Sequence, residues 1–100
     1  MYFLVLEAHP KPAHNEYGIV DGAFASCFVN ATSAPDAEEL ARDFLVRLGW
    51  DIEQVDEEPR WIDRVDLNGN RESLDRFDQA AIDGIVVTLN QWSVGASDDE

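Results

Sequence analysis

Hydrophobic residues recur at two spacings along this chain, and each spacing predicts one type of element. Residues 2–8 form a short apolar and aromatic run, which predicts a strand that ends before Pro10. Its better core face consists of Tyr2, Leu4, Leu6 and Ala8, and Phe3 and Val5 indicate that the other face is partly covered as well. Residues 23–30 alternate, with small side chains on one face and Phe24 and Phe28 on the other. A helix packs closely against small side chains, so we expect helices to cover the small face and to leave Phe24 and Phe28 open.

Two helices are predicted from apolar residues that recur every three or four positions. The first begins after Ser33, whose hydroxyl can cap it, and ends at Gly49. The second begins after Asn70 or Ser73 and ends at Gly84. The residues expected to face the core are Ala37, Leu40, Ala41, Phe44, Leu45 and Leu48 in the first helix and Leu74, Phe77, Ala80 and Ala81 in the second.

Three further strands are predicted from runs of apolar and β-branched residues. Residues 50–55 and 85–89 form clear runs, whereas residues 60–65 alternate only weakly and predict a short strand. Because residues 85–89 are the most apolar, we expect them in the centre of the sheet. The acidic residues before Pro59 predict a turn between two of these strands.

The order of the elements predicts the fold class. After the strand at 2–8 come strand, helix, strand, strand, helix and strand, which is the order of the ferredoxin-like arrangement. We therefore expect an α+β, ferredoxin-like two-layer sandwich, with two helices on one face of an antiparallel sheet of four or five strands. The strand at 2–8 is expected to extend that sheet as an extra N-terminal strand. Without a strand at 60–65, the sheet has four strands and another α+β layout.

Length and composition set limits on the class of protein. A chain of 100 residues fits one domain, expected over residues 1–95, followed by a disordered acidic tail at 96–100. Cys27 is the only cysteine, so no disulfide can form within the chain, and we expect it buried and inert. No apolar stretch reaches the roughly 20 residues that span a bilayer, and the first residues lack the basic segment of a signal peptide. These features predict a cytoplasmic protein.

The net charge of −14 bears on the choice of partner. Such a charge repels phosphate groups, so we expect neither direct nucleic-acid binding nor membrane binding. The simplest interpretation of the charge is solubility. The more specific interpretation is a protein partner with a basic surface.

Few residues in the chain carry the chemistry of a catalytic or metal site. Glu7, His9 and His14 are the weak candidates for a metal site, because zinc accepts imidazole nitrogen and carboxylate oxygen. Their spacing matches no known metal-binding signature, and two exposed loop histidines are the simpler interpretation. His9 as a general base would need a nucleophile that the sequence does not place beside it. We therefore predict no catalytic residue, no metal site and no cofactor.

Aromatic residues give the leading hypothesis, which is a non-enzymatic protein-binding module. Exposed tryptophan and phenylalanine side chains on an open sheet face are typical of a binding surface. Two forms are considered: a homodimer through the open sheet face, and an inhibitor or immunity-type protein that binds a basic partner. The candidate interface residues are Phe24, Phe28, Trp50, Trp61 and Trp92.

The alternative hypothesis is a small-ligand-binding protein or an enzyme. It would use the His9–His14 loop together with the end of the last strand at Asn90–Trp92. The loop is longer than most connections, and long loops often carry function. A deep pocket that joins the loop to this strand end would favour the alternative.

Overall fold

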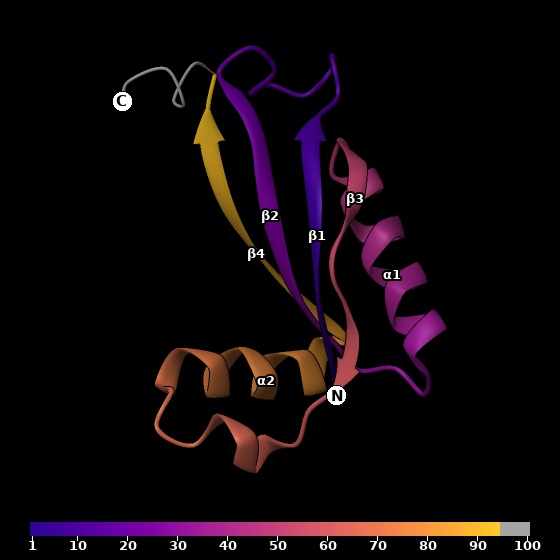
Figure 1. Ribbon diagram of the computed structural model, residues 1–100, viewed down its shortest axis with the longest axis vertical. Helices are drawn as coiled ribbons and strands as arrows, with labels where there is room; N and C mark the ends of the chain where they lie inside the picture. Colours follow the sequence, from indigo (N-terminus) through magenta and orange to yellow (C-terminus); the bar gives the residue numbers. More distant parts are fainter. Residues whose placement is uncertain (95–100) are drawn as a thin grey trace.

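Four strands form one antiparallel sheet in the computed structural model, which describes residues 1–94 (Figure 1). The elements are β1 (Tyr2–Pro10), β2 (Val20–Val29), α1 (Ala34–Arg47), β3 (Trp50–Trp61), a short 3₁₀ helix (Arg64–Leu67), α2 (Arg71–Asp83) and β4 (Ile85–Ser93). Neighbouring strands lie in the order β3-β1-β2-β4. Helix α1 lies along one side of the sheet and helix α2 crosses its lower end. The α+β class is therefore confirmed, and the predicted tail at 96–100 lies outside the described residues.

The sheet order does not confirm the ferredoxin-like arrangement. β1 lies between β2 and β3 in the middle of the sheet, and the strongly apolar β4 lies at one edge, not in the centre. The predicted separate strand at 60–65 is wrong, because β3 continues to Trp61 and residues 64–67 form the 3₁₀ helix. An edge strand tolerates acidic residues and Pro59, since its outer side faces water. The acidic residues and Pro59, which predicted a turn, therefore belong to an edge strand.

Helix α1 covers one face of the sheet, chiefly over β3. Ser33 caps it by accepting a hydrogen bond from the backbone N–H of Asp36 at 3.3 Å. The buried residues of α1 are Ala37, Ala41 and Leu45, which pack against Leu4, Leu6, Ala25, Cys27 and Val29 of the sheet. Leu40 and Leu48 remain 49% and 52% exposed, so only part of the predicted apolar stripe reaches the core.

Helix α2 packs against the opposite face of the sheet, so the prediction of two helices on one face is wrong. Its fully buried residue, Ala80, lies in a second core cluster with Phe28 and Ile62, and Phe77 packs against the same cluster. Phe28 is therefore only 5% exposed, contrary to the prediction that it lies open. Ala81, predicted to face inward, is exposed. The chain reaches this face because the segment after β3 turns at Ile62 beneath the sheet.

A salt bridge holds the 3₁₀ helix against α2. The Arg64 guanidinium donates two hydrogen bonds to the Asp78 carboxylate, both at 2.9 Å. These bonds lower the pKa of the Asp78 carboxyl below its ordinary value.

Neither α1 nor α2 is long and apolar enough to cross a membrane, in the part of the chain that the structure describes.

Candidate functional site

The upper half of the second sheet face carries the candidate site. α2 covers the lower half of this face, at Phe28 and Val86, and within residues 1–94 no helix crosses the upper half (Figure 1). Strand register places Glu7 beside Phe24 and Phe24 beside Asn90 on this surface. We call it the open half-face, and it consists of Glu7, His9, Phe24, Ser26, Asn90 and Trp92.

An aromatic pair forms the apolar part of the open half-face. The rings of Phe24 and Trp92 lie 5.1 Å apart between centroids with 49° between their planes. Phe24 is 37% exposed and Trp92 is half-buried. A β carbon added at Gly22 would lie 2.4 Å from Trp92 Cζ2, so the tryptophan ring lies against the bare backbone of β2. Only glycine at this position lets the ring pack so closely.

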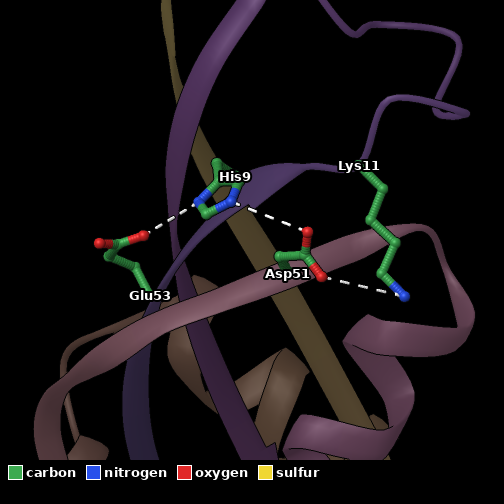
Figure 2. A network of polar contacts seen from close by, with 4 residues as sticks. All are labelled: His9, Lys11, Asp51 and Glu53. Carbon is green, nitrogen blue, oxygen red and sulfur yellow. Dashed lines mark ion pairs between the residues drawn. The ribbon is translucent and has the colours of Figure 1, made fainter.

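Carboxylates from β1 and β3 surround the polar end of the open half-face. The Glu7 carboxylate accepts a hydrogen bond from Gln54 Nε2 at 2.8 Å. His9 lies between two carboxylates, with Nδ1 3.1 Å from Glu53 Oε1 and Nε2 3.8 Å from Asp51 Oδ2 (Figure 2). All of these groups are at least partly exposed. This end therefore presents negative charge to solvent.

Lys11 also belongs to this network. Its Nζ lies 4.0 Å from Asp51 Oδ1, on the side of Asp51 away from His9 (Figure 2). The lysine and the carboxylate are both well exposed, at 36% and 49%. An exposed pair at this distance contributes little to stability, so Asp51 remains available to a cationic group on a partner.

The weak metal candidates do not come together. His14 lies away from His9, with its ring 5.1 Å from the Trp50 ring, and its Nδ1 accepts a hydrogen bond from the Glu16 N–H at 3.0 Å. The Glu7 carboxylate accepts from Gln54, whereas His9 pairs with residues of β3. Among residues 1–94, no group of three or more histidine, cysteine or acidic side chains could hold a metal ion. His14 therefore anchors its loop to the turn before β3.

The three tryptophans have different positions. Trp50 is 2% exposed and belongs to the core, so it is not available at an interface. Trp61 is 58% exposed at the far end of β3, where it packs edge-on against Tyr2 and its Nε1–H donates to Asp63 at 3.0 Å. Trp92 lies on the open half-face. Of the five candidate interface residues, the structure brings only Phe24 and Trp92 together.

A shallow pocket of about 330 Å³ lies beside His9. It joins β1 to the loop before β2 and to Val94, at the end of the last strand. Neither His14 nor residues 90–92 line it, so it is not the deep pocket that would join those two regions. Its lining residues are His9, Pro10, Tyr17, Gly18, Val20, Asp21 and Val94.

The one thiol lies outside the open half-face. Cys27 is fully buried under α1, as predicted, and its Sγ donates to the Ala25 carbonyl at 3.5 Å. Burial raises the pKa of the Cys27 thiol to about 12. A thiol with so high a pKa is not a nucleophile at neutral pH, so Cys27 is a core residue.

Sequence reasoning missed three residues of this site. Gly22 looked like a turn residue next to Asp21, although its role is to admit the Trp92 ring. Asp51 and Glu53 were ordinary members of an acidic segment, and only the pairing of β1 with β3 brings them to His9. The alternation of residues 50–53 was the available signal, since it places both carboxylates on one face of a strand.

Comparisons with known proteins do not indicate a function for this chain. No protein-family model matches this chain, and no curated protein and no solved structure matches it either. Function is therefore inferred from the residues of the open half-face and from their surroundings.

Proposed function

We propose that this protein is a protein-binding module whose open half-face binds a basic surface of another protein. The observation that carries the proposal is the Phe24–Trp92 pair, which lies partly exposed on a sheet surface that no helix of residues 1–94 covers and is bordered by carboxylates. Interfaces of this kind combine a central aromatic anchor with a polar rim. The aromatic pair would supply the anchor, and Glu7, Asp51 and Glu53 would supply the rim.

The aromatic pair is suited to the anchor because its position is fixed before binding. Trp92 is held between the Phe24 ring and the backbone at Gly22, so little side-chain freedom remains to be lost. Ordering a mobile side chain at an interface costs about 0.5–1.5 kcal/mol, which a prepositioned ring avoids. The pair therefore offers apolar area at a low entropic cost.

The charge distribution favours a basic partner over a second copy of this chain. A homodimer through the open half-face would bring the Glu7, Asp51 and Glu53 carboxylates of two chains toward one another, and each chain carries a net charge of −14. Like charges placed opposite each other oppose association, whereas opposite charges accelerate it. The burial of Phe28 also removes one of the two phenylalanines that a face-to-face dimer would have used. An inhibitor or immunity-type role is the form of the proposal that these features support.

Small-ligand binding has one observation in its favour, the pocket beside His9. Its volume is at the low end of the roughly 300–1,000 Å³ that ligand pockets occupy. His9 lines it and is also paired with two carboxylates, so a cationic ligand is the class that the pocket would suit. Among residues 1–94, no serine, threonine, cysteine or lysine lines it, and we therefore rank ligand binding second.

The proposal is tested by affinity capture from an extract of the native source. Immobilised wild type is compared with Phe24→Ala and with Trp61→Ala, which removes an exposed aromatic ring from another part of the surface. We expect the same protein on wild type and Trp61→Ala, with recovery on Phe24→Ala at least about tenfold lower. Raising the salt from about 50 mM to about 500 mM should release that protein, because exposed charge pairs are screened.

Two results would contradict the proposal. One is a partner that binds equally well to wild type and Phe24→Ala. The other is a partner that stays bound at high salt, which would exclude an acidic rim as a main contributor. Circular dichroism of each variant shows whether the immobilised chain is folded.

A further inference from the structure

The two edges of the sheet differ sharply in how they are protected. β3 carries six charged residues and Pro59, and its pairing with β1 is interrupted by three register shifts. Charges, proline and bulges are the usual means by which an edge strand is kept from pairing with another chain. β4 carries no charged residue and no proline over its nine residues, and it pairs in register with β2 from Gly22 to Val29. Among residues 1–94, β4 is therefore the edge that lacks these protections.

Charge makes β4 the side on which two copies of this chain can meet. Each copy carries a net charge of −14, so most pairs of surfaces repel each other. β3 contributes five acidic residues and one arginine to its edge, whereas β4 contributes none. A second copy therefore meets the least electrostatic repulsion at β4.

The two ends of β4 have complementary apolar features. Beside its first residue lies a groove of about 470 Å³, in which the apolar Leu40, Leu48 and Ile85 lie among the charged side chains of Asp43, Arg47 and Asp83. Beyond its last residue, Val94 donates a backbone hydrogen bond to the Ile19 carbonyl at 3.0 Å. Val94 and Ile19 form an apolar tip and are 55% and 64% exposed. Groove and tip thus lie at opposite ends of the same edge strand.

We infer that two copies of this chain associate through β4, with their β4 strands antiparallel about a two-fold axis. Full overlap of the strands places Leu89 opposite Leu89 of the partner subunit and Ile85 opposite Ser93 of the partner subunit. An antiparallel two-fold brings the end of each strand to the start of the other, so each apolar tip lies beside the groove of the other copy. The product is a continuous sheet of eight strands.

A stable interface is larger than β4 alone, and for this reason the groove and the tip also take part in the contact. Stable interfaces use roughly 20–30 residues on each side, which is more than β4 alone supplies. The groove and the tip add apolar contacts at both ends, and main-chain hydrogen bonds along β4 add the rest. We expect a dimer with a dissociation constant in the micromolar range. The inference does not depend on the proposed function.

The test compares the mass in solution of wild type, Thr88→Lys and Gln54→Lys by light scattering. The concentrations run from about 5 to about 500 μM, which extends to both sides of the expected dissociation constant. Thr88→Lys places two ammonium groups near the two-fold axis, whereas Gln54→Lys makes the same charge change on the β3 edge. We expect wild type and Gln54→Lys to approach twice the chain mass. The dissociation constant of Thr88→Lys should rise at least about tenfold, although the less negative net charge of this variant would by itself favour association.

Monomeric wild type throughout that range overturns the inference, and so does a Thr88→Lys dimer as stable as wild type. A second measurement decides the matter if Thr88→Lys does not fold. Under mild oxidation, Leu89→Cys should form a covalent dimer at least about tenfold faster than Val65→Cys, because residues opposite each other across a two-fold are close enough for a disulfide. Equal rates for the two cysteine variants would refute the β4 pairing.

Discussion

Leucines on α1 allow a direct test of which side of this helix faces the sheet. Leu45 is fully buried in the main core cluster, whereas Leu40 is 49% exposed on the same helix. Replacing each with alanine makes an identical chemical change in the same secondary structure. Any difference between the two variants therefore reports their burial.

The expected magnitudes follow from the buried area. Leu45→Ala removes the equivalent of three buried methylene groups, at about 0.8 kcal/mol each, and leaves a cavity beneath α1. The total is about 3 kcal/mol of unfolding free energy. Leu40→Ala removes the same groups from a half-exposed position and leaves no enclosed cavity, so it should cost about 1 kcal/mol or less.

Urea denaturation followed by circular dichroism measures both free energies. The midpoint should fall clearly for Leu45→Ala and slightly for Leu40→Ala, with the same dependence on urea, because neither change alters the surface exposed on unfolding. In a thermal scan the difference of about 2 kcal/mol should separate the midpoints by roughly 8–16 °C. Equal losses for the two variants would show that α1 presents another side to the sheet.

Three further predictions concern other parts of the molecule. Gly22→Val should displace the Trp92 ring and lower partner capture while the fold is retained. The near-ultraviolet circular dichroism spectrum should then change, because it reports aromatic packing, and the far-ultraviolet spectrum should not, because it reports secondary structure. An unchanged near-ultraviolet spectrum would contradict the packing of Trp92 against Gly22. The Cys27 thiol, with its pKa raised to about 12, should react with a thiol reagent at pH 8 only after unfolding in urea, and rapid reaction of the folded protein would show that it is accessible. Asp78→Asn should lower the free energy of unfolding by the contribution of the Arg64–Asp78 ion pair. That contribution is complete above the ordinary carboxyl pKa and is lost as the pH falls through the lowered pKa of Asp78, so the free energies of wild type and variant should converge in acid. A difference that stays constant with pH would exclude the ion pair as its cause.

Local features of the fold were accessible from the sequence because they depend on neighbouring residues. The Ser33 cap needs only the N–H of Asp36 three positions on, and the apolar composition of residues 2–8 is enough to predict a strand there. The arrangement of the sheet was not accessible in this way. Whether α2 returns to the face of α1 or crosses to the other depends on contacts such as Ile62 with Phe28, between residues far apart in the chain.

The candidate site was predicted in part for the same reason. Phe24 and Trp92 were expected at an interface, yet nothing in the sequence paired them, because their contact requires β2 and β4 to be neighbours. Phe28 and Phe24 share a strand face, and only the position of α2 makes one a core residue and leaves the other open. Amino-acid type identified the aromatic candidates, and topology decided which of them are available.

The most direct test of the central claim is to locate the bound partner on the surface of this protein. Amide chemical shifts of the isotope-labelled chain are recorded by NMR as the captured protein is added. We predict that the largest changes fall on the open half-face, at Glu7, Phe24 and Asn90, and that they diminish as salt is added. Changes confined to α1 or to the outer edge of β3, with these three amides unaffected, would contradict the claim that the open half-face is the binding surface.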